Sequence, residues 1–132
     1  MKLSLLPLLA IASLALGGCD KDNCNGGTDG DVSIVTFAVH NGDTLRNYAA
    51  HPDTAFVKFN AISSPGTSPS NFDTYFVGSA GEDHIHLEDL ECGNYFIYRT
   101  AFDSVANKTY TGSTYVNVPE KAPDAVIYID VN

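Results

Sequence analysis

NYFIYRTAF, residues 94–102, is the stretch that decides the fold, because it carries the strongest strand pattern of the chain. Aromatic and β-branched side chains, which favour strands, fill most of it. Gly93 directly before it allows the tight turn through which Tyr95 enters the core, since glycine adopts positive φ at little cost. The stretch therefore predicts a β-strand that begins after a glycine turn.

Six further strand-like stretches lie on both sides of this one, at intervals of roughly ten to fifteen residues. Turn-forming residues separate them, and no helical periodicity occurs beyond residue 18. We therefore predict an all-β domain, an antiparallel β-sandwich of about seven strands. The expected strands are 32–40, 54–60, 72–77, 83–87, 94–102, 110–118 and 125–131.

The connections and the core follow from the same patterns. Residues 61–71 hold two prolines, four serines and one glycine, so we expect a long exposed loop. Residues 78–81 (GSAG) have the glycines of a hairpin connection. Apolar positions that alternate with polar ones give the expected core: Val57, Phe59, Ile85, Leu87, Leu90, Ile97, Val116, Val118, Ile127 and Ile129.

Two segments resemble transthyretin-like (prealbumin-like) domains. Residues 81–97 (GEDHIHLEDLECGNYFI) resemble the glycine, alternating strand, leucine and Gly-x-Tyr-x-aliphatic segment of that family, and residues 53–57 (DTAFV) resemble its second strand. The resemblance covers most of residues 31–132 and implies a transthyretin-like or immunoglobulin-like sandwich. The chain departs from the family in lacking the Gly-x-Pro turn after the first strand.

The first 18 residues have the features of a secretory signal peptide. Lys2 precedes an apolar run over residues 3–16, and Gly17 and Gly18 are the small residues that a peptidase needs. A membrane-spanning helix needs about 20 apolar residues, so this run is too short to span a bilayer. The sequence therefore predicts an exported protein.

The residues that follow resemble a lipid-attachment signal. Residues 16–19 (LGGC) are similar to the lipobox of bacterial lipoproteins, which implies acyl chains such as palmitate on Cys19 and a membrane partner held through lipid alone. Residues 20–22 (DKD) resemble the signal of surface-exposed Bacteroidetes lipoproteins, which implies display on the outer membrane. The alternative is an ordinary cleaved signal with a chance cysteine.

The chain thus divides into a signal peptide (1–18), a lipidated flexible tether (19–30) and a β-sandwich domain (31–132). The tether is expected because residues 23–30 (NCNGGTDG) are polar and contain three glycines. Loss of the signal peptide removes one of seven basic residues and none of the 16 acidic ones, so the charge changes from −9 to −10. Such an acidic surface repels phosphate, and we expect no nucleic-acid partner.

Three cysteines remain to be assigned. With Cys19 taken by lipid, Cys24 and Cys92 form a candidate disulfide in an oxidising compartment. The alternative has Cys92 buried as a small apolar residue and Cys24 free.

His84 and His86 form a candidate metal site, because residues two apart on a strand project from one face. The alternative is that Ile85 and Leu87 face the core while both imidazoles face solvent without a metal. The sequence does not place a third ligand, for which the candidates are His40, His51, Glu82 and Asp83.

Two kinds of surface site concern glycans. Tyr98, Tyr115 and Tyr128 fall on strand positions opposite the core and could stack on a sugar or small ligand, although exposed tyrosines on sandwich strands more often pair across the sheet. Three short stretches resemble the Asp-Ser/Thr-apolar acceptor sites of Bacteroidetes O-glycosylation, and their acceptors are Thr44, Thr54 and Ser104.

The functional signals favour binding over catalysis. The chain has no Gly-x-Ser-x-Gly elbow for a nucleophile, and its carboxylate pairs lie in acidic turns where solvation explains them. We expect a surface module without enzymatic activity or cofactor that contacts a protein or polymer through its loops, above all residues 61–71. The alternatives are a glycan or small-ligand binder and a metal-binding or hydrolytic protein around His84 and His86.

Overall fold

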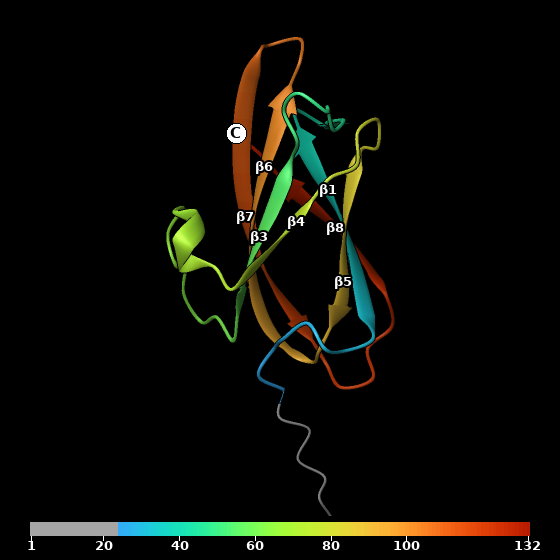
Figure 1. Ribbon diagram of the computed structural model, residues 1–132, viewed down its shortest axis with the longest axis vertical. Coiled ribbons are helices and arrows are strands. Elements are labelled where there is room, and N and C mark those ends of the chain that lie inside the picture. The colour runs from blue at the N-terminus through green and yellow to red at the C-terminus, as the bar shows by residue number, and fades with distance from the viewer. Residues whose placement is uncertain (1–23) are drawn as a thin grey trace, which may run out of the picture.

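The computed structural model describes residues 24–132, which form two β-sheets packed face to face (Figure 1). The predicted all-β sandwich is confirmed, with eight strands in the described part of the chain. The elements are β1 (Val32–His40), β2 (Asp43–Thr44), β3 (Thr54–Phe59), a 3₁₀ turn η1 (Pro69–Asn71), β4 (Thr74–Val77), β5 (His84–Leu90), β6 (Gly93–Asp103), β7 (Lys108–Val118) and β8 (Ala125–Asp130). No helix within residues 24–132 is long and apolar enough to cross a membrane.

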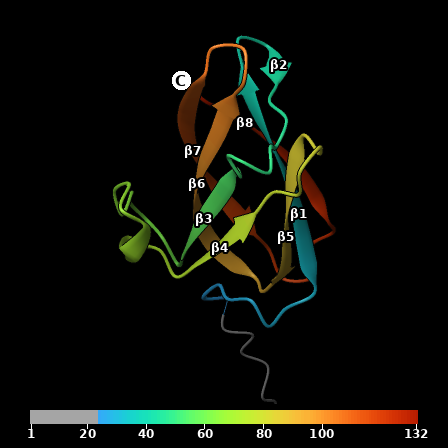
Figure 2. The ribbon, with the colours of Figure 1, turned by 45° about the horizontal axis from the view of Figure 1, so that its top comes forward.

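The two sheets differ in how their strands are paired (Figure 2). One sheet has the order β4-β3-β6-β7, and all its pairs are antiparallel. In the other, β1 pairs with β2, β5 and β8, and the β1–β8 pair is parallel. The sandwich is therefore not wholly antiparallel as predicted. The reason is that the chain leaves β7 for the other sheet and enters β8 from the end at which β1 also begins.

The core lies between the sheets and follows the two-residue alternation of the strands. Of the ten predicted core residues, seven are fully buried. The other three, Phe59, Val116 and Ile127, are partly buried and pack against that cluster. Tyr95 also enters the core, as its position after Gly93 predicts.

Residues 78–81 do not form the predicted hairpin. β4 pairs with β3 and β5 pairs with β1, so the connection crosses from one sheet to the other. It winds around Asn47, whose carbonyl accepts from the N–H of Gly81 (2.9 Å) and whose N–H donates to the carbonyl of Glu82 (2.7 Å). A Cβ on Gly78 would lie 2.4 Å from the Asn47 side chain. Glycine at position 78 therefore permits close packing rather than a hairpin turn.

Residues 24–30 are not the flexible tether that their composition predicts. Cys24 is bonded to Cys92 in a disulfide, and the Gly26 N–H donates to the Cys92 carbonyl (3.0 Å). Gly93 has a φ of 151°, and a Cβ on it would lie 2.3 Å from the nitrogen of Gly26. Gly93, at the start of β6, thus has a second purpose, because it leaves room for the N-terminal segment. Residues 19–23 of the expected tether lie outside the described residues.

The Tyr95 hydroxyl also holds residues 24–30 in place. It donates to the carbonyl of Glu91 (2.6 Å) and accepts from the N–H of Gly27 (3.0 Å). Burial raises the pKa of Tyr95, so the hydroxyl keeps its proton for these bonds. The side chain that fills the core therefore also anchors the start of the domain.

Candidate functional site

The outer face of the β4-β3-β6-β7 sheet carries a continuous group of aromatic rings, which we call the aromatic face. The strand register puts Tyr75 and Tyr98 on either side of Phe56, and Tyr115 opposite Phe96. Neighbouring ring centroids are 4.9 to 6.3 Å apart, within the range of favourable aromatic pairs. Its members are Phe56, Phe72, Tyr75, Phe96, Tyr98 and Tyr115.

The loop 61–71 is largely exposed, as predicted, and ends at this face (Figure 1). Phe72, the next residue, lies against two aromatic rings of β6. Asp73 fastens the end of the loop to β3, because its carboxylate accepts from the N–H of Phe59 (2.7 Å) and pairs with the Lys58 ammonium (3.1 Å). The predicted binding loop and two of the three predicted tyrosines, Tyr98 and Tyr115, are thus parts of one surface.

A hollow of about 500 Å³ lies between this loop and β4. Aromatic rings form much of its wall, and hydroxyl and carboxylate groups lie among them. Tyr75 and Tyr115 are 64 % and 53 % exposed, so the aromatic face offers free ring surface as well as packed rings. The hollow is lined by Thr54, Phe56, Pro69, Ser70, Phe72, Asp73, Thr74 and Tyr75.

The structure separates the three tyrosines that the sequence grouped together. Tyr98 and Tyr115 belong to the aromatic face, whereas Tyr128 lies on β8 in the other sheet and stacks on Phe37 at 5.1 Å. The alternation of polar and apolar residues predicts which side chains of a strand project outward, but it does not predict the sheet to which the strand belongs. Phe72 was not predicted, because its place depends on the path of the loop.

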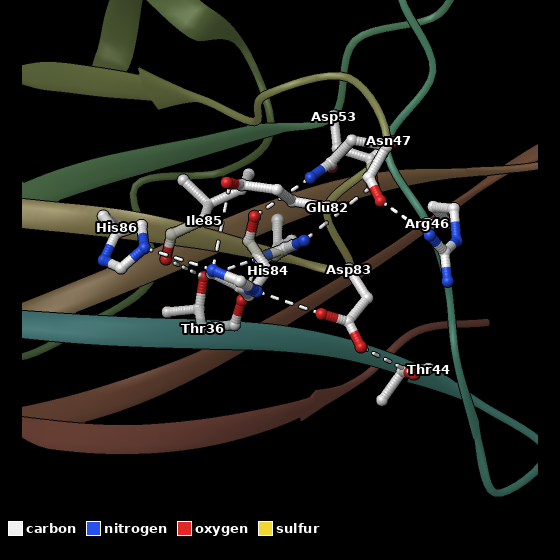
Figure 3. Close-up of polar contacts among 12 residues, drawn as sticks. Thr36, Thr44, Arg46, Asn47, Asp53, Glu82, Asp83, His84, Ile85 and His86 are labelled. Carbon is white, nitrogen blue, oxygen red and sulfur yellow. Dashed lines mark hydrogen bonds and ion pairs between the residues drawn. The ribbon is translucent and has the colours of Figure 1, made fainter.

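His84 and His86 project from one face of β5, as their spacing predicts, and their imidazole rings are in contact. The two Nε2 atoms are 3.1 Å apart. Glu82, just before the strand, places Oε2 3.8 Å from Nε2 of His84 (Figure 3). One ligand atom from each of the three residues lies within 4.8 Å of the others.

Two of the four candidate third ligands lie elsewhere. The Nδ1 of His40 is 2.8 Å from the carbonyl of Val131, and its ring stacks on Tyr110. His51 stacks on Phe102 with ring centroids 4.0 Å apart. Both imidazoles are therefore engaged in packing away from β5.

Asp83, the remaining candidate, contacts the opposite nitrogen of His84. Its Oδ1 is 3.0 Å from Nδ1, and this hydrogen bond lowers the pKa of the Asp83 carboxyl. Thr44 on β2 donates to the other carboxylate oxygen over 3.4 Å, and Asn47 donates from Nδ2 to the His84 carbonyl over 2.9 Å (Figure 3). The carboxylate thus orients the imidazole, while Asn47 fixes the backbone.

A buried charge pair, which the sequence analysis missed, lies inside the sandwich. The guanidinium of Arg99 is fully buried, and its Nη2 is 3.8 Å from Oδ2 of Asp53. Burial raises the pKa of Asp53 to about 6 against the opposing effects of the Phe102 N–H and of Arg99. Burial also lowers the pKa of Arg99 to about 10. Arg99 lies in phase with Tyr95 and Ile97 on β6, which is the signal that could have revealed it.

The remaining predicted sites are dispersed. Of the predicted O-glycosylation acceptors, Thr44 and Ser104 are exposed, whereas Thr54 is half-buried at the start of β3. Cys24 and Cys92 are paired, whereas Cys19 lies outside the described residues.

Comparisons with known proteins provide no relative for this chain. No protein-family model, no curated protein and no solved structure matches it.

Proposed function

We propose that this protein is a lipid-anchored binding module of the bacterial cell envelope, displayed on the outer membrane, which holds a glycan chain on its aromatic face. The observation that carries this proposal is the cluster of six neighbouring aromatic rings, which includes Phe72, the residue directly after the loop 61–71. A binding role without a catalytic step and without a cofactor accounts for this surface.

The chemistry of the face suits a sugar polymer. Tyrosine and phenylalanine rings can cover the apolar C–H faces of sugar rings, and exposed tyrosine hydroxyls add hydrogen bonds. Thr54, Ser70 and Thr74 supply further hydroxyls in the hollow beside Tyr75. An apolar hollow with a few polar groups is the usual form of a small-ligand site. The formal charge of −9 for the whole chain disfavours polyanionic ligands.

The proposed anchor is the acylated Cys19. Five residue steps separate it from Cys24, which is bonded to the domain, so the link reaches at most about 18 Å when fully extended. The proposal therefore places the Cys24 end of the sandwich near the bilayer, while η1 lies at the flank of the sandwich (Figure 1).

A glycan array probed with the mature protein tests the ligand. We expect a signal that Tyr115→Ala and Tyr98→Ala abolish and that Tyr128→Ala, on the other sheet, leaves intact. Two results together would show that the ligand is a protein instead of a glycan. The array would give no signal, and one protein would cross-link to the wild type on living cells but not to Tyr115→Ala. Labelled palmitate tests the anchor, because Cys19→Ala should abolish its incorporation.

A further inference from the structure

We propose that Glu82, His84 and His86 bind one divalent first-row transition-metal ion, with Zn²⁺ as the representative, on the outer face of β5. This site lies on the sheet opposite the aromatic face. The inference therefore goes beyond the glycan-binding role and does not depend on it.

The positions of the ligand atoms already fit one small ion. Zinc binds imidazole nitrogen at about 2.0–2.1 Å in a tetrahedral arrangement, which separates two such nitrogens by roughly 3.3 Å. The Nε2 atoms of His84 and His86 are 3.1 Å apart. Glu82 Oε2, 3.8 Å from His84 Nε2, comes within ligand distance by a small rotation of an exposed side chain. No strand has to move.

The backbone beneath the three ligands is held at several points. His84 and His86 occupy successive outward positions of β5, which pairs with β1 along its length. Asn47 donates from its N–H to the Glu82 carbonyl (2.7 Å) and from Nδ2 to the His84 carbonyl (2.9 Å). The backbone of the ligands is therefore fixed before the ion binds, which reduces the entropy lost on binding.

Asp83 prepares His84 for a metal. An ionised carboxylate can only accept, so its contact with Nδ1 (3.0 Å) places the imidazole proton there and leaves the Nε2 lone pair directed at Glu82 and His86. Metal-bound histidines almost always donate the second ring N–H to a carboxylate, a backbone carbonyl or water, and Asp83 is a partner of the first kind. Phe37 packs on the same ring at a centroid distance of 5.4 Å and limits its rotation.

The donor set selects the class of ion. Two imidazoles and one carboxylate suit Zn²⁺, Cu²⁺, Ni²⁺ and Fe²⁺, whereas Mg²⁺ and Ca²⁺ require oxygen ligands. Three protein ligands leave a fourth position of a tetrahedral ion free, and the same three residues line a hollow of about 230 Å³ together with Ser79 and Glu88. The site is thus of the open type, with room for water or a ligand atom from outside.

Calorimetry on the untagged mature protein, freed of metal by chelator, tests the proposal. Titration with ZnCl₂ should give one ion per chain, and MgCl₂ and CaCl₂ should give no heat. His86→Gln and Glu82→Gln should weaken zinc binding, whereas His51→Gln, a matched substitution in a packed ring elsewhere, should leave it unchanged. Asp83→Asn should lower the affinity by about 10- to 100-fold.

NMR of the four histidine side chains supplies a readout that does not depend on stability. Zinc should shift the ring signals of His84 and His86 and leave those of His40 and His51 in place. Absence of heat with ZnCl₂, or equal zinc affinity in wild type and His86→Gln with correct folding by circular dichroism, would overturn the proposal. Zinc-induced shifts confined to His40 or His51 would overturn it as well.

Discussion

Arg99 on β6 donates from Nη1 to both the carbonyl and the hydroxyl oxygen of Thr36 on β1, over 2.5 and 2.6 Å. A fully buried guanidinium thereby joins the two sheets through the centre of the sandwich. Its other terminal nitrogen faces Asp53, 3.8 Å away. The stability of the domain should therefore depend on a polar contact at the place where a sandwich is usually apolar.

Arg99→Met is expected to lower the free energy of unfolding by about 3–5 kcal/mol at pH 8, because it leaves the Asp53 carboxylate buried without a counter-charge. Urea denaturation measures the loss. Arg46→Met is the control, since Arg46 is exposed and makes one hydrogen bond, to the Gly81 carbonyl over 2.7 Å. That change should cost about 1 kcal/mol. Equal losses in the two variants would contradict the importance of the buried contact.

Stability should fall as the pH rises through 6, because of Asp53. Its pKa is raised from 3.8 to about 6 in the folded protein, so the folded state binds the proton more tightly than the unfolded chain. The stability gained from protonation is complete below pH 4 and lost above pH 6, by linkage on the order of 2 kcal/mol. Urea denaturation at pH 4 and pH 7 measures this effect.

Asp53→Asn isolates this contribution from the other carboxylates. The amide oxygen of asparagine can still accept from the Phe102 N–H, which lies 2.9 Å from Oδ1. Between pH 4 and pH 7 the wild type should lose on the order of 2 kcal/mol more than the variant. Parallel pH profiles for the two proteins would show that Asp53 titrates normally.

Tyr95→Phe should destabilise the domain by about 1–3 kcal/mol, because the N–H of Gly27 and the carbonyl of Glu91 lose their partner. Thermal and urea unfolding give the difference. Tyr115→Phe removes the hydroxyl of a half-exposed tyrosine and should change stability by less than about 0.5 kcal/mol. A larger effect at Tyr115 than at Tyr95 would be inconsistent with the hydroxyl contacts described.

Reduction of the Cys24–Cys92 bond should lower the free energy of unfolding by about 4 kcal/mol, since the bond closes a loop with a sequence separation of 68. Urea denaturation with and without dithiothreitol measures this difference. Cys92→Ser should unfold like the reduced wild type and should not respond to the reductant. Identical mobility of wild type and Cys92→Ser on a non-reducing gel would argue against the bond.

Phe72→Ala should free the loop 61–71, because the ring is its attachment to the aromatic rings of β6. Proteinase K should then cut within the loop several-fold faster. Ile62→Ala is the matched control, since Ile62 is 92 % exposed in the same loop and holds nothing in place. Unchanged cleavage in Phe72→Ala would mean that the loop is held by Asp73 alone.

Much of the fold could be predicted because strands leave a local signature. The bounds of β1 were predicted as observed, and β8 was predicted within one residue, since alternation and β-branched residues are local properties. β2 is only two residues long and is defined by its pairing with β1, so no local sequence pattern predicts it. The glycines of residues 78–81 signal a turn but not the sheet to which the chain goes next.

The candidate sites, like the strands, are only partly visible in local sequence patterns. Alternation predicts that His84 and His86 share a face, yet the choice of Glu82 as the third ligand depends on how Asn47 holds the start of β5. Arg99 was missed because a charged side chain is normally assigned to solvent, although its phase on β6 is that of the core. Side chains that act through tertiary contacts thus remain hidden from local patterns.

The Cys24–Cys92 bond also determines how the molecule would bear mechanical load. If Cys19 is acylated, a pull on a captured polymer enters at the aromatic face, runs along β6 to the adjoining Cys92, and crosses the covalent bond to Cys24. The other sheet then lies outside the path of tension. In particular β1, which pairs with three strands, is shielded from being unzipped from its N-terminal end. With an acylated Cys19, the β4-β3-β6-β7 sheet and the disulfide would carry the shear force between polymer and membrane.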